Sequence, residues 1–137
     1  LNTELQALGF SIIDDRKHRI IEKIKNLIIK IAHGEEEAPK QNISFYLSEQ
    51  LHLDYNYLSS LFSEIENTTI EKFFINQKTE RVKELLVYDE LTLNEIAFHL
   101  GYSSAAHLSN QFKKVTGLTP GYFKKVKENK RKPLDEV

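Results

Sequence analysis

The stretch that decides the fold covers residues 96–120 and reads IAFHLGYSSAAHLSNQFKKVTGLTP. Its central part repeats a stretch that lies earlier in the chain. An apolar triad at i, i+4 and i+7 occurs twice, fifty residues apart, as Leu58, Phe62 and Ile65 and as Leu108, Phe112 and Val115. This spacing places three apolar side chains on one face of a helix. We therefore expect two helices of the same design, over residues 55–65 and 104–115, each turning its triad towards a core.

The residues that follow each triad repeat as well. The matching pairs are Asn67 with Gly117, Thr69 with Thr119, and Phe73 with Phe123. Asn and Gly both tolerate positive φ and suit the left-handed residue that ends a helix. Thr is a good N-cap, and Pro120 suits the first position of a helix, where no N–H is needed. Each triad helix is thus expected to stop and to be followed by another helix.

The residues before each triad match at a spacing of forty-nine. The pairs are Leu47 with Ile96, Ser48 with Ala97, Leu51 with Leu100, and Leu53 with Tyr102. Small Ser48 and Ala97 would let two helices cross closely. The first helix of the second copy is predicted to start at Thr92, which stands at capping-box spacing from Glu95. The first helix of the first copy is predicted to start at Asn42 or Ser44. Each copy is therefore predicted to be a helix, a tight turn that contains Gly101 in the second copy, and a second helix.

The rest of the chain also shows helical spacing, so the predicted class is all-α. Residues 14–33 form an amphipathic helix ended by Gly34, with an apolar stripe of Ile20, Ile21, Ile24, Leu27, Ile28 and Ile31. The stripe is interpreted as core against the first unit, with a homodimer seam as the alternative. Residues 34–39 are expected to be an acidic loop, residues 1–8 a helical turn and residues 10–13 a short extended run. Since the chain starts at Leu1 and has no Met, we expect a fragment of a longer protein.

Composition restricts the possible functions. The 137 residues are 40% hydrophobic and 28% charged, which allows a packed core. No apolar stretch is long enough for a membrane span or signal peptide, so a cytoplasmic location is expected. The absence of Cys excludes disulfides and thiolate zinc sites. The net charge of −1 hides an asymmetry, because residues 1–71 carry 7 basic against 12 acidic side chains and residues 72–137 carry 12 against 8. A basic second half is typical of nucleic-acid binding, although a solvated tail is the plain alternative.

The helix faces opposite the triads are short, polar and mostly uncharged. A rotation of 100° per residue places Ala106, Ser109, Asn110 and Lys113 there in the second copy, and Asn56, Ser59, Ser60 and Ser63 in the first. Side chains of this kind fit the major groove and reach base edges, and Asn pairs bidentately with adenine. Lys113, Lys114 and the helix start after Thr119 would bind phosphate. A solvated polar surface is the alternative reading for each residue by itself.

The second copy closely resembles the second helix-turn-helix signature of the AraC/XylS family of transcriptional regulators. The motifs are Ile96-Ala97 with Gly101-Tyr102, and Phe112-Lys113-Lys114 with Gly117 and Thr119-Pro120. The resemblance implies two tri-helical helix-turn-helix subdomains joined by a long helix. The corresponding division is a tail at 1–13, a first subdomain at 14–69, a connecting helix at 70–90, a second subdomain at 91–127 and a tail at 128–137.

The resemblance also implies roles for single residues. Base contacts are expected from Tyr55, Asn56, Ser59, Ser60, Ala105, Ala106, Ser109 and Asn110, and phosphate contacts from Lys113 and Thr119. Apart from the resemblance, we expect further phosphate contacts from Lys114, Lys124 and Lys125, and from Lys78 and Arg81 on the connecting helix. Family members commonly carry large or basic residues where this chain has Asn56, Ser60 and Asn110, and often Tyr-Arg where it has Phe123-Lys124. The first recognition helix also lacks Lys and Arg and carries Glu64 and Glu66. We therefore expect the second copy to anchor binding.

No other chemistry is indicated. His99 and His107 fall on different helices and lack clustered partners, so no metal site and no cofactor are predicted. No Gly-rich phosphate loop or nucleophile elbow occurs, and no enzymatic activity is expected. The predicted partner is double-stranded DNA, with RNA polymerase as a further candidate. The fragment is expected to be monomeric, with weak self-association as the alternative. The rival hypothesis is a helical protein-interaction module that uses the Ile stripe or the acidic first half.

Overall fold

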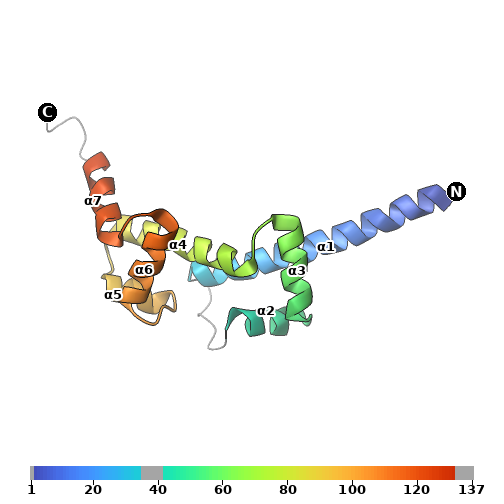
Figure 1. Cartoon of the computed structure of the whole chain (residues 1–137), viewed down its shortest axis with the longest axis horizontal. Helices are drawn as coiled ribbons and strands as arrows, with labels where there is room; N and C mark the ends of the chain where they lie inside the picture. The colour runs from blue at the N-terminus through green and yellow to red at the C-terminus, as the bar shows by residue number, and fades with distance from the viewer. Residues whose placement is uncertain (1, 35–41, 132–137) are drawn as a thin grey trace. The chain divides into compact units, whose positions relative to one another are not determined.

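The structure, a computed structural model, describes residues 2–34 and 42–131, and every regular element within these ranges is an α-helix (Figure 1). This confirms the predicted all-α class. The helices are α1 (Asn2–Ala32), α2 (Ile43–Leu51), α3 (Tyr55–Glu66), α4 (Ile70–Tyr88), α5 (Leu93–His99), α6 (Ala105–Thr116) and α7 (Pro120–Arg131). They form two compact units, whose boundary along α4 falls after Phe74.

Helix α1 starts earlier than the sequence pattern indicated. It runs without a break from Asn2, so the extended run predicted at residues 10–13 is wrong. Extending an existing helix fixes one residue per new hydrogen bond, which is far easier than starting a new element. Gly34, with φ of 76°, follows the end of the helix as predicted, and the expected acidic loop at 35–39 lies outside the described residues.

The first unit has its own core. Ile21, Ile24 and Ile28 of α1 pack with Leu47 of α2, with Ile70, and with Leu58, Leu61 and Phe62 of α3. The stripe of α1 from Ile20 to Ile28 therefore packs into the core of the first unit, as interpreted, whereas Ile31 is buried but does not belong to this cluster. Phe62 and Phe73 contact each other with ring centroids 5.5 Å apart. These contacts turn one face of α3 inward and leave the opposite face free.

The second unit repeats this arrangement with different residues. Its core consists of Val82, Leu86, Ile96, Ala97, Leu100, Tyr102, Leu108, Phe112 and Phe123. The ring centroids of Phe112 and Phe123 lie 5.6 Å apart, as in the matching pair of the first unit. One prediction is wrong here, because Val115 is 42% exposed. Leu118, which follows α6, packs against this core instead.

Helix ends follow the predicted capping signals. Asn67 and Gly117 take φ of 57° and 80° and end α3 and α6. Thr69 and Thr119 accept backbone N–H groups of Lys72 and Tyr122, each at 3.1 Å, at the starts of α4 and α7. Asn42 caps α2, and Thr92 with Glu95 forms the full capping box of α5. The capping chemistry therefore sets where each pair of helices begins and ends.

The two tight turns are built differently at equivalent positions. Gly101 has a left-handed φ of 76°, and His52 occupies the matching place in the first unit with φ of 55°. In the first unit, the Ser48 hydroxyl donates to the Leu53 carbonyl at 2.6 Å. In the second, the Tyr102 N–H donates to the carbonyl of Ala97 at 2.9 Å. Both turns thus join the same two positions, through a side chain in one unit and through the backbone in the other.

Candidate functional site

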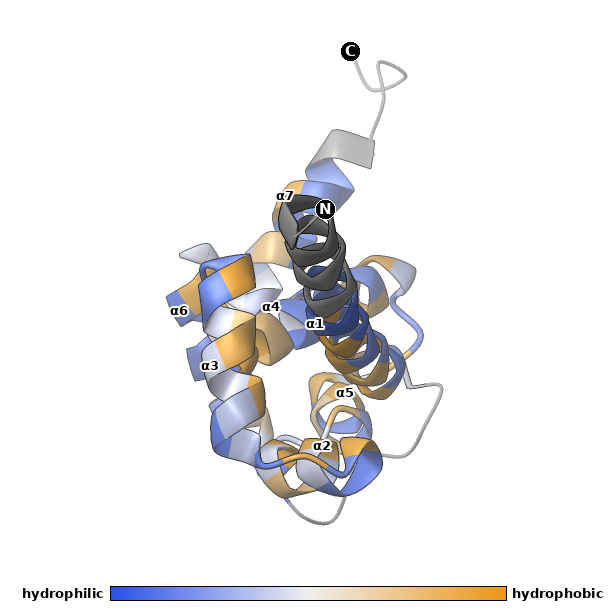
Figure 2. Cartoon of the chain, turned by 90° about the vertical axis from the view of Figure 1, so that its right-hand side faces the viewer, coloured by the Kyte–Doolittle hydropathy of each residue, from blue (hydrophilic) through white to orange (hydrophobic). Residues whose placement is uncertain are grey.

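Helix α6 presents the most complete polar face. Ser104 caps it by accepting the His107 N–H at 3.0 Å, and Leu108 and Phe112 are fully buried on the inner side. This burial turns Ala106 and Asn110 outward, where both are exposed. Figure 2, coloured by hydropathy, shows that the helices carry both apolar (orange) and polar (blue) residues. Ala105 and Ser109 are half-buried at the margins of this face.

The end of α6 carries free positive charge. Lys113 and Lys114 are exposed, and neither forms an ion pair with a described residue. Gly117 then turns the chain, and the exposed Thr119 begins α7, whose first residue Pro120 is buried. One short segment therefore combines two lysines with a capped helix start, which suits an anionic ligand.

Helix α3 offers a similar face without the lysines. Asp54 caps it, and Asn56 and Ser60 are exposed, whereas Ser59 is half-buried. Tyr55 differs from the others because its hydroxyl donates to Glu71 of α4 and its ring packs against the core of the first unit. Burial, followed by this hydrogen bond, raises the pKa of the Tyr55 phenol. The outward face of α3 is thus formed by Asn56 and Ser60, with Tyr55 already bound to Glu71.

The charges of α3 are negative. Glu66 forms an ion pair with Lys25 of α1 at 2.5 Å, and Glu64 is exposed. No basic residue lies within α3, whereas α6 carries Lys113 and Lys114. An anionic surface would therefore be attracted to α6 and repelled by the exposed end of α3.

The other expected phosphate contacts are placed differently from one another. Lys78 is half-buried, with its ammonium 4.2 Å from the centre of the Tyr102 ring, and burial lowers the pKa of Lys78. Arg81 forms an ion pair with Glu84 at 2.8 Å, and Lys124 pairs with Asp89. Lys125 is exposed. Among these four cations, Lys125 is the one that combines full exposure with the absence of an ion pair to a described residue.

One polar side chain on α6 was not predicted to take part. His107 is exposed, its ring packs edge-on against Tyr102 at a centroid distance of 5.3 Å, and its Nδ1 lies 3.1 Å from the Ser103 hydroxyl. The available sequence signal was a serine four residues before a histidine across a helix start. That pattern indicates a local side-chain bond as readily as a ligand contact.

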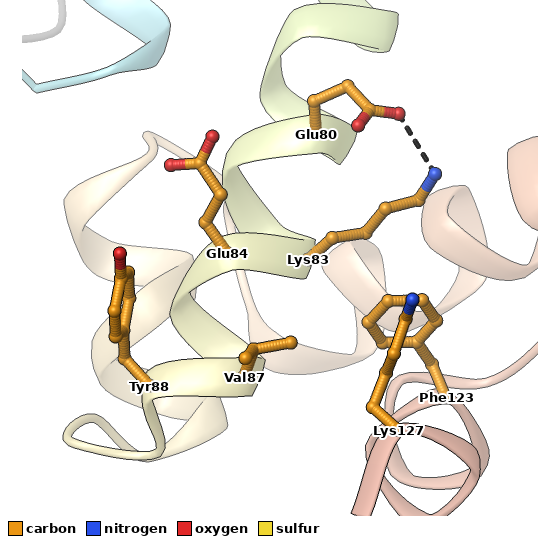
Figure 3. Close-up of a pocket in the computed structure, with 7 residues that line it drawn as sticks. All are labelled: Glu80, Lys83, Glu84, Val87, Tyr88, Phe123 and Lys127. Carbon is orange, nitrogen blue, oxygen red and sulfur yellow. Dashed lines mark hydrogen bonds and ion pairs between the residues drawn. The ribbon is translucent and has the colours of Figure 1, made fainter. Parts of the chain in front are cut away.

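A hollow of about 430 Å³ lies between α4 and α7 in the second unit (Figure 3). Val87 and Phe123 contribute its apolar lining, and Lys83 pairs with Glu80 at 2.9 Å beside it. The lining residues include no serine, threonine or histidine. Within the described ranges, no three His, Asp or Glu side chains gather as a metal site would require, and no helix is long and apolar enough to cross a bilayer.

The sequence resembles those of transcription regulators. Residues 47–125 match the family described as a helix-turn-helix domain. The HTH-type transcriptional regulator YtdP of Bacillus subtilis is 27% identical over 106 residues, which cover 77% of this chain. The matching part makes up 14% of that regulator, so the chain spans a small fraction of this relative.

Solved structures agree with the sequence match. The C-terminal domain of the two-component response regulator yesN from Fusobacterium nucleatum is 29% identical, with a TM-score of 0.65 over 75% of this chain and 95% of that domain. The DNA-binding domain of AdpA, solved in complex with a target DNA, has a TM-score of 0.69 over 81% of this chain and 95% of that one. At 15% identity, the latter likeness concerns the fold alone.

Proposed function

The chain belongs to the AraC type of helix-turn-helix proteins, and we propose that it is a sequence-specific binding domain for double-stranded DNA in a bacterial transcription regulator. In this proposal, α3 and α6 are recognition helices that read successive major grooves. The observation that carries it is the outer face of α6, where exposed Asn110, Lys113 and Lys114 lie opposite fully buried Leu108 and Phe112.

The two kinds of side chain on this face would do different work. Asn110 would read a base, for which its amide offers a donor and an acceptor together, while the half-buried Ser109 and the methyl groups of Ala105 and Ala106 would contact neighbouring base edges. Lys113, Lys114 and the start of α7 at Thr119 would hold the phosphates. Lys125 would extend this positive surface, whereas Lys78, Arg81 and Lys124 would have to leave their present partners or share them with phosphate.

The first unit would add a weaker contact. Asn56, Ser59 and Ser60 would reach bases from α3, and Tyr55 would contribute only if its hydroxyl exchanged Glu71 for DNA. Because α3 contains no basic residue, its docking would depend on the fit of a cognate sequence more than on charge. The second unit is therefore proposed as the anchor.

Selection of bound duplexes from a random pool tests the proposal, followed by titration of the selected site at several salt concentrations. We expect one enriched motif and steeply salt-dependent affinity. Failure to enrich any sequence at physiological salt would favour the rival reading of a protein-interaction module.

Two variants then separate the roles of α6. Asn110→Ala should cost about 1–3 kcal/mol on the selected site and relax preference at one base position. Lys113→Ala should weaken selected and random duplexes alike and reduce the salt dependence. Equal losses on both duplexes for both variants would contradict this division of labour.

RNA polymerase as a further partner, a monomeric state of the chain, a cytoplasmic location and the absence of enzymatic activity stay predictions. Co-purification with polymerase and sedimentation of the purified chain test the first two.

A further inference from the structure

The side chain of His107 is held in one orientation by the turn before α6. Its Nδ1 lies 3.4 Å from the backbone nitrogen of Ser103 and 3.1 Å from the Ser103 hydroxyl. Its ring stands at 83° to the ring of Tyr102, which is itself buried in the core of the second unit. The backbone N–H and the hydroxyl of Ser103, together with the buried ring of Tyr102, therefore hold the imidazole of His107 in place although it is exposed.

This arrangement selects one tautomer of the ring. A backbone N–H only donates, so His107 Nδ1 accepts from Ser103 and the proton of the neutral ring sits on Nε2. The Ser103 hydroxyl can donate to the same nitrogen. His107 thus offers an uncharged N–H donor whose direction is set before any ligand arrives.

The position of His107 on the helix indicates which ligand atom it would meet. At 100° per residue, Asn110 lies near the centre of the outer face, while His107 and Lys114 lie together on one flank, two turns apart. When a helix enters a major groove, its centre faces the bases and its flanks face the phosphate backbones. His107 and Lys114 would therefore face the same wall of the groove.

We propose that the neutral, preoriented ring of His107 donates its Nε2–H to a DNA phosphate. This phosphate belongs to the same strand that Lys114 contacts, and the proposal rests on the proposed function. Lys114 supplies charge, whereas His107 supplies a directed hydrogen bond at the start of the recognition helix. The hydrogen bond fixes the orientation of the helix in the groove. Because the donor is uncharged, its contact with phosphate releases no counterion.

The test compares wild-type protein with His107→Phe, which keeps a ring against Tyr102 but has no donor, and with Lys114→Gln as the matched charged control. Affinities are measured at about pH 8, above the ordinary pKa of histidine, across a series of salt concentrations. His107→Phe should lose roughly tenfold in affinity on selected and random duplexes alike. The salt slope, which is the slope of the logarithm of affinity against the logarithm of salt concentration, should be unchanged. Lys114→Gln should lower that slope by about one.

A methylphosphonate scan of the selected duplex adds a second readout. Neutralising the contacted phosphate should weaken wild-type protein and leave His107→Phe unchanged, and His107→Gln, which keeps an N–H near the Nε2 position, should recover part of the lost affinity. Circular dichroism and the thermal midpoint establish that each variant is folded.

Three results would overturn the proposal. They are unchanged affinity in His107→Phe, a loss confined to one base position, and a fall in salt slope as large as that of Lys114→Gln. Failure of the wild-type protein to select any DNA would instead reject the proposed function itself, so the two failures are distinguishable.

Discussion

The two helix-turn-helix units share a scaffold but differ in almost every polar detail. Phe62 and Phe112 are buried at equivalent places and each contacts a phenylalanine of the following helix. On the outside, α6 carries exposed lysines, whereas α3 has no basic residue and ends at Glu66, which is paired with Lys25. The two copies thus share the residues that form their cores and differ in the polar residues on the outer faces of α3 and α6.

Under the proposed function, this difference predicts a division of labour between the two units. A unit with free cations gains affinity on any DNA, because phosphates are present on every sequence. A unit with short uncharged side chains and nearby carboxylates gains only where its hydrogen bonds fit. The first unit is therefore suited to discrimination and the second to anchorage.

The largest effects are expected where the units are alike. Phe62→Ala and Phe112→Ala should each lower the free energy of unfolding by about 3–5 kcal/mol, since both remove a fully buried ring with an aromatic neighbour. Urea denaturation measures the loss, and amide hydrogen exchange shows which unit opens. If one substitution cost less than a third of the other, the equivalence of the two cores would be wrong.

Exchange of the charges should produce the next largest effect. Ser63 and Glu64 stand where Lys113 and Lys114 stand in the second copy, so Ser63→Lys with Glu64→Lys would give α3 the lysines of α6. We expect about a tenfold gain in affinity on random duplexes over the range of ordinary salt concentrations, and a salt slope steeper by about two.

The reverse exchange, Lys113→Ser with Lys114→Glu, is the matched control and should produce a loss of at least equal size. If the added lysines left binding to random DNA unchanged, the missing charge would not explain why the first unit is the weaker one.

The sequence predicted the elements because their signals are local. Caps at Thr69, Thr92 and Thr119 and stops at Asn67 and Gly117 act within one turn of helix, and all lie where the pattern placed them. The long start of α1 was missed because β-branched residues at 10–13 favour strands only when a partner strand exists, and none lies among the described residues.

The errors and omissions at the site have tertiary causes. Val115 follows the triad spacing but is exposed, and the bond between Tyr55 and Glu71 joins residues sixteen apart. Gln111 replaces Leu61 in the repeat, and its buried Oε1 has no hydrogen-bond partner among the described residues. Such features depend on which helix passes nearby, and periodicity within one helix does not contain that information.

The left-handed turn residues provide a smaller test of the comparison. His52 and Gly101 occupy equivalent positions with φ of 55° and 76°. The left-handed conformation destabilises a residue with a Cβ by about 1–2 kcal/mol. Gly avoids this strain, but its greater flexibility also stabilises the unfolded state. His52→Gly should therefore stabilise the first unit by roughly 0.5–1 kcal/mol, and Gly101→Ala should destabilise the second by about 1–2 kcal/mol.

Urea denaturation of the two single variants and of the double variant measures both effects. Destabilisation by His52→Gly would mean that the His52 side chain makes a contact worth more than the strain of its backbone.

The smallest expected effect is on the pH dependence of stability, which should differ between the start of α5 and the equivalent start of α2. Glu95 completes the capping box of α5, and its hydrogen bonds with Thr92 lower the pKa of the Glu95 carboxyl. A lowered folded pKa means that the stabilisation is present above the ordinary pKa of Glu and is lost as pH falls through the folded value. Asn42, which caps α2, does not titrate, so the first unit lacks this dependence at its equivalent helix start.

Glu95→Gln keeps the capping geometry without a titrating group. Its thermal midpoint should therefore fall less than that of the wild type between neutral and acidic pH, with hydrogen exchange placing the difference in α5. Identical pH profiles for the two proteins would show that the capping carboxylate of Glu95 contributes nothing that the neutral amide does not, and would remove this distinction between the two units.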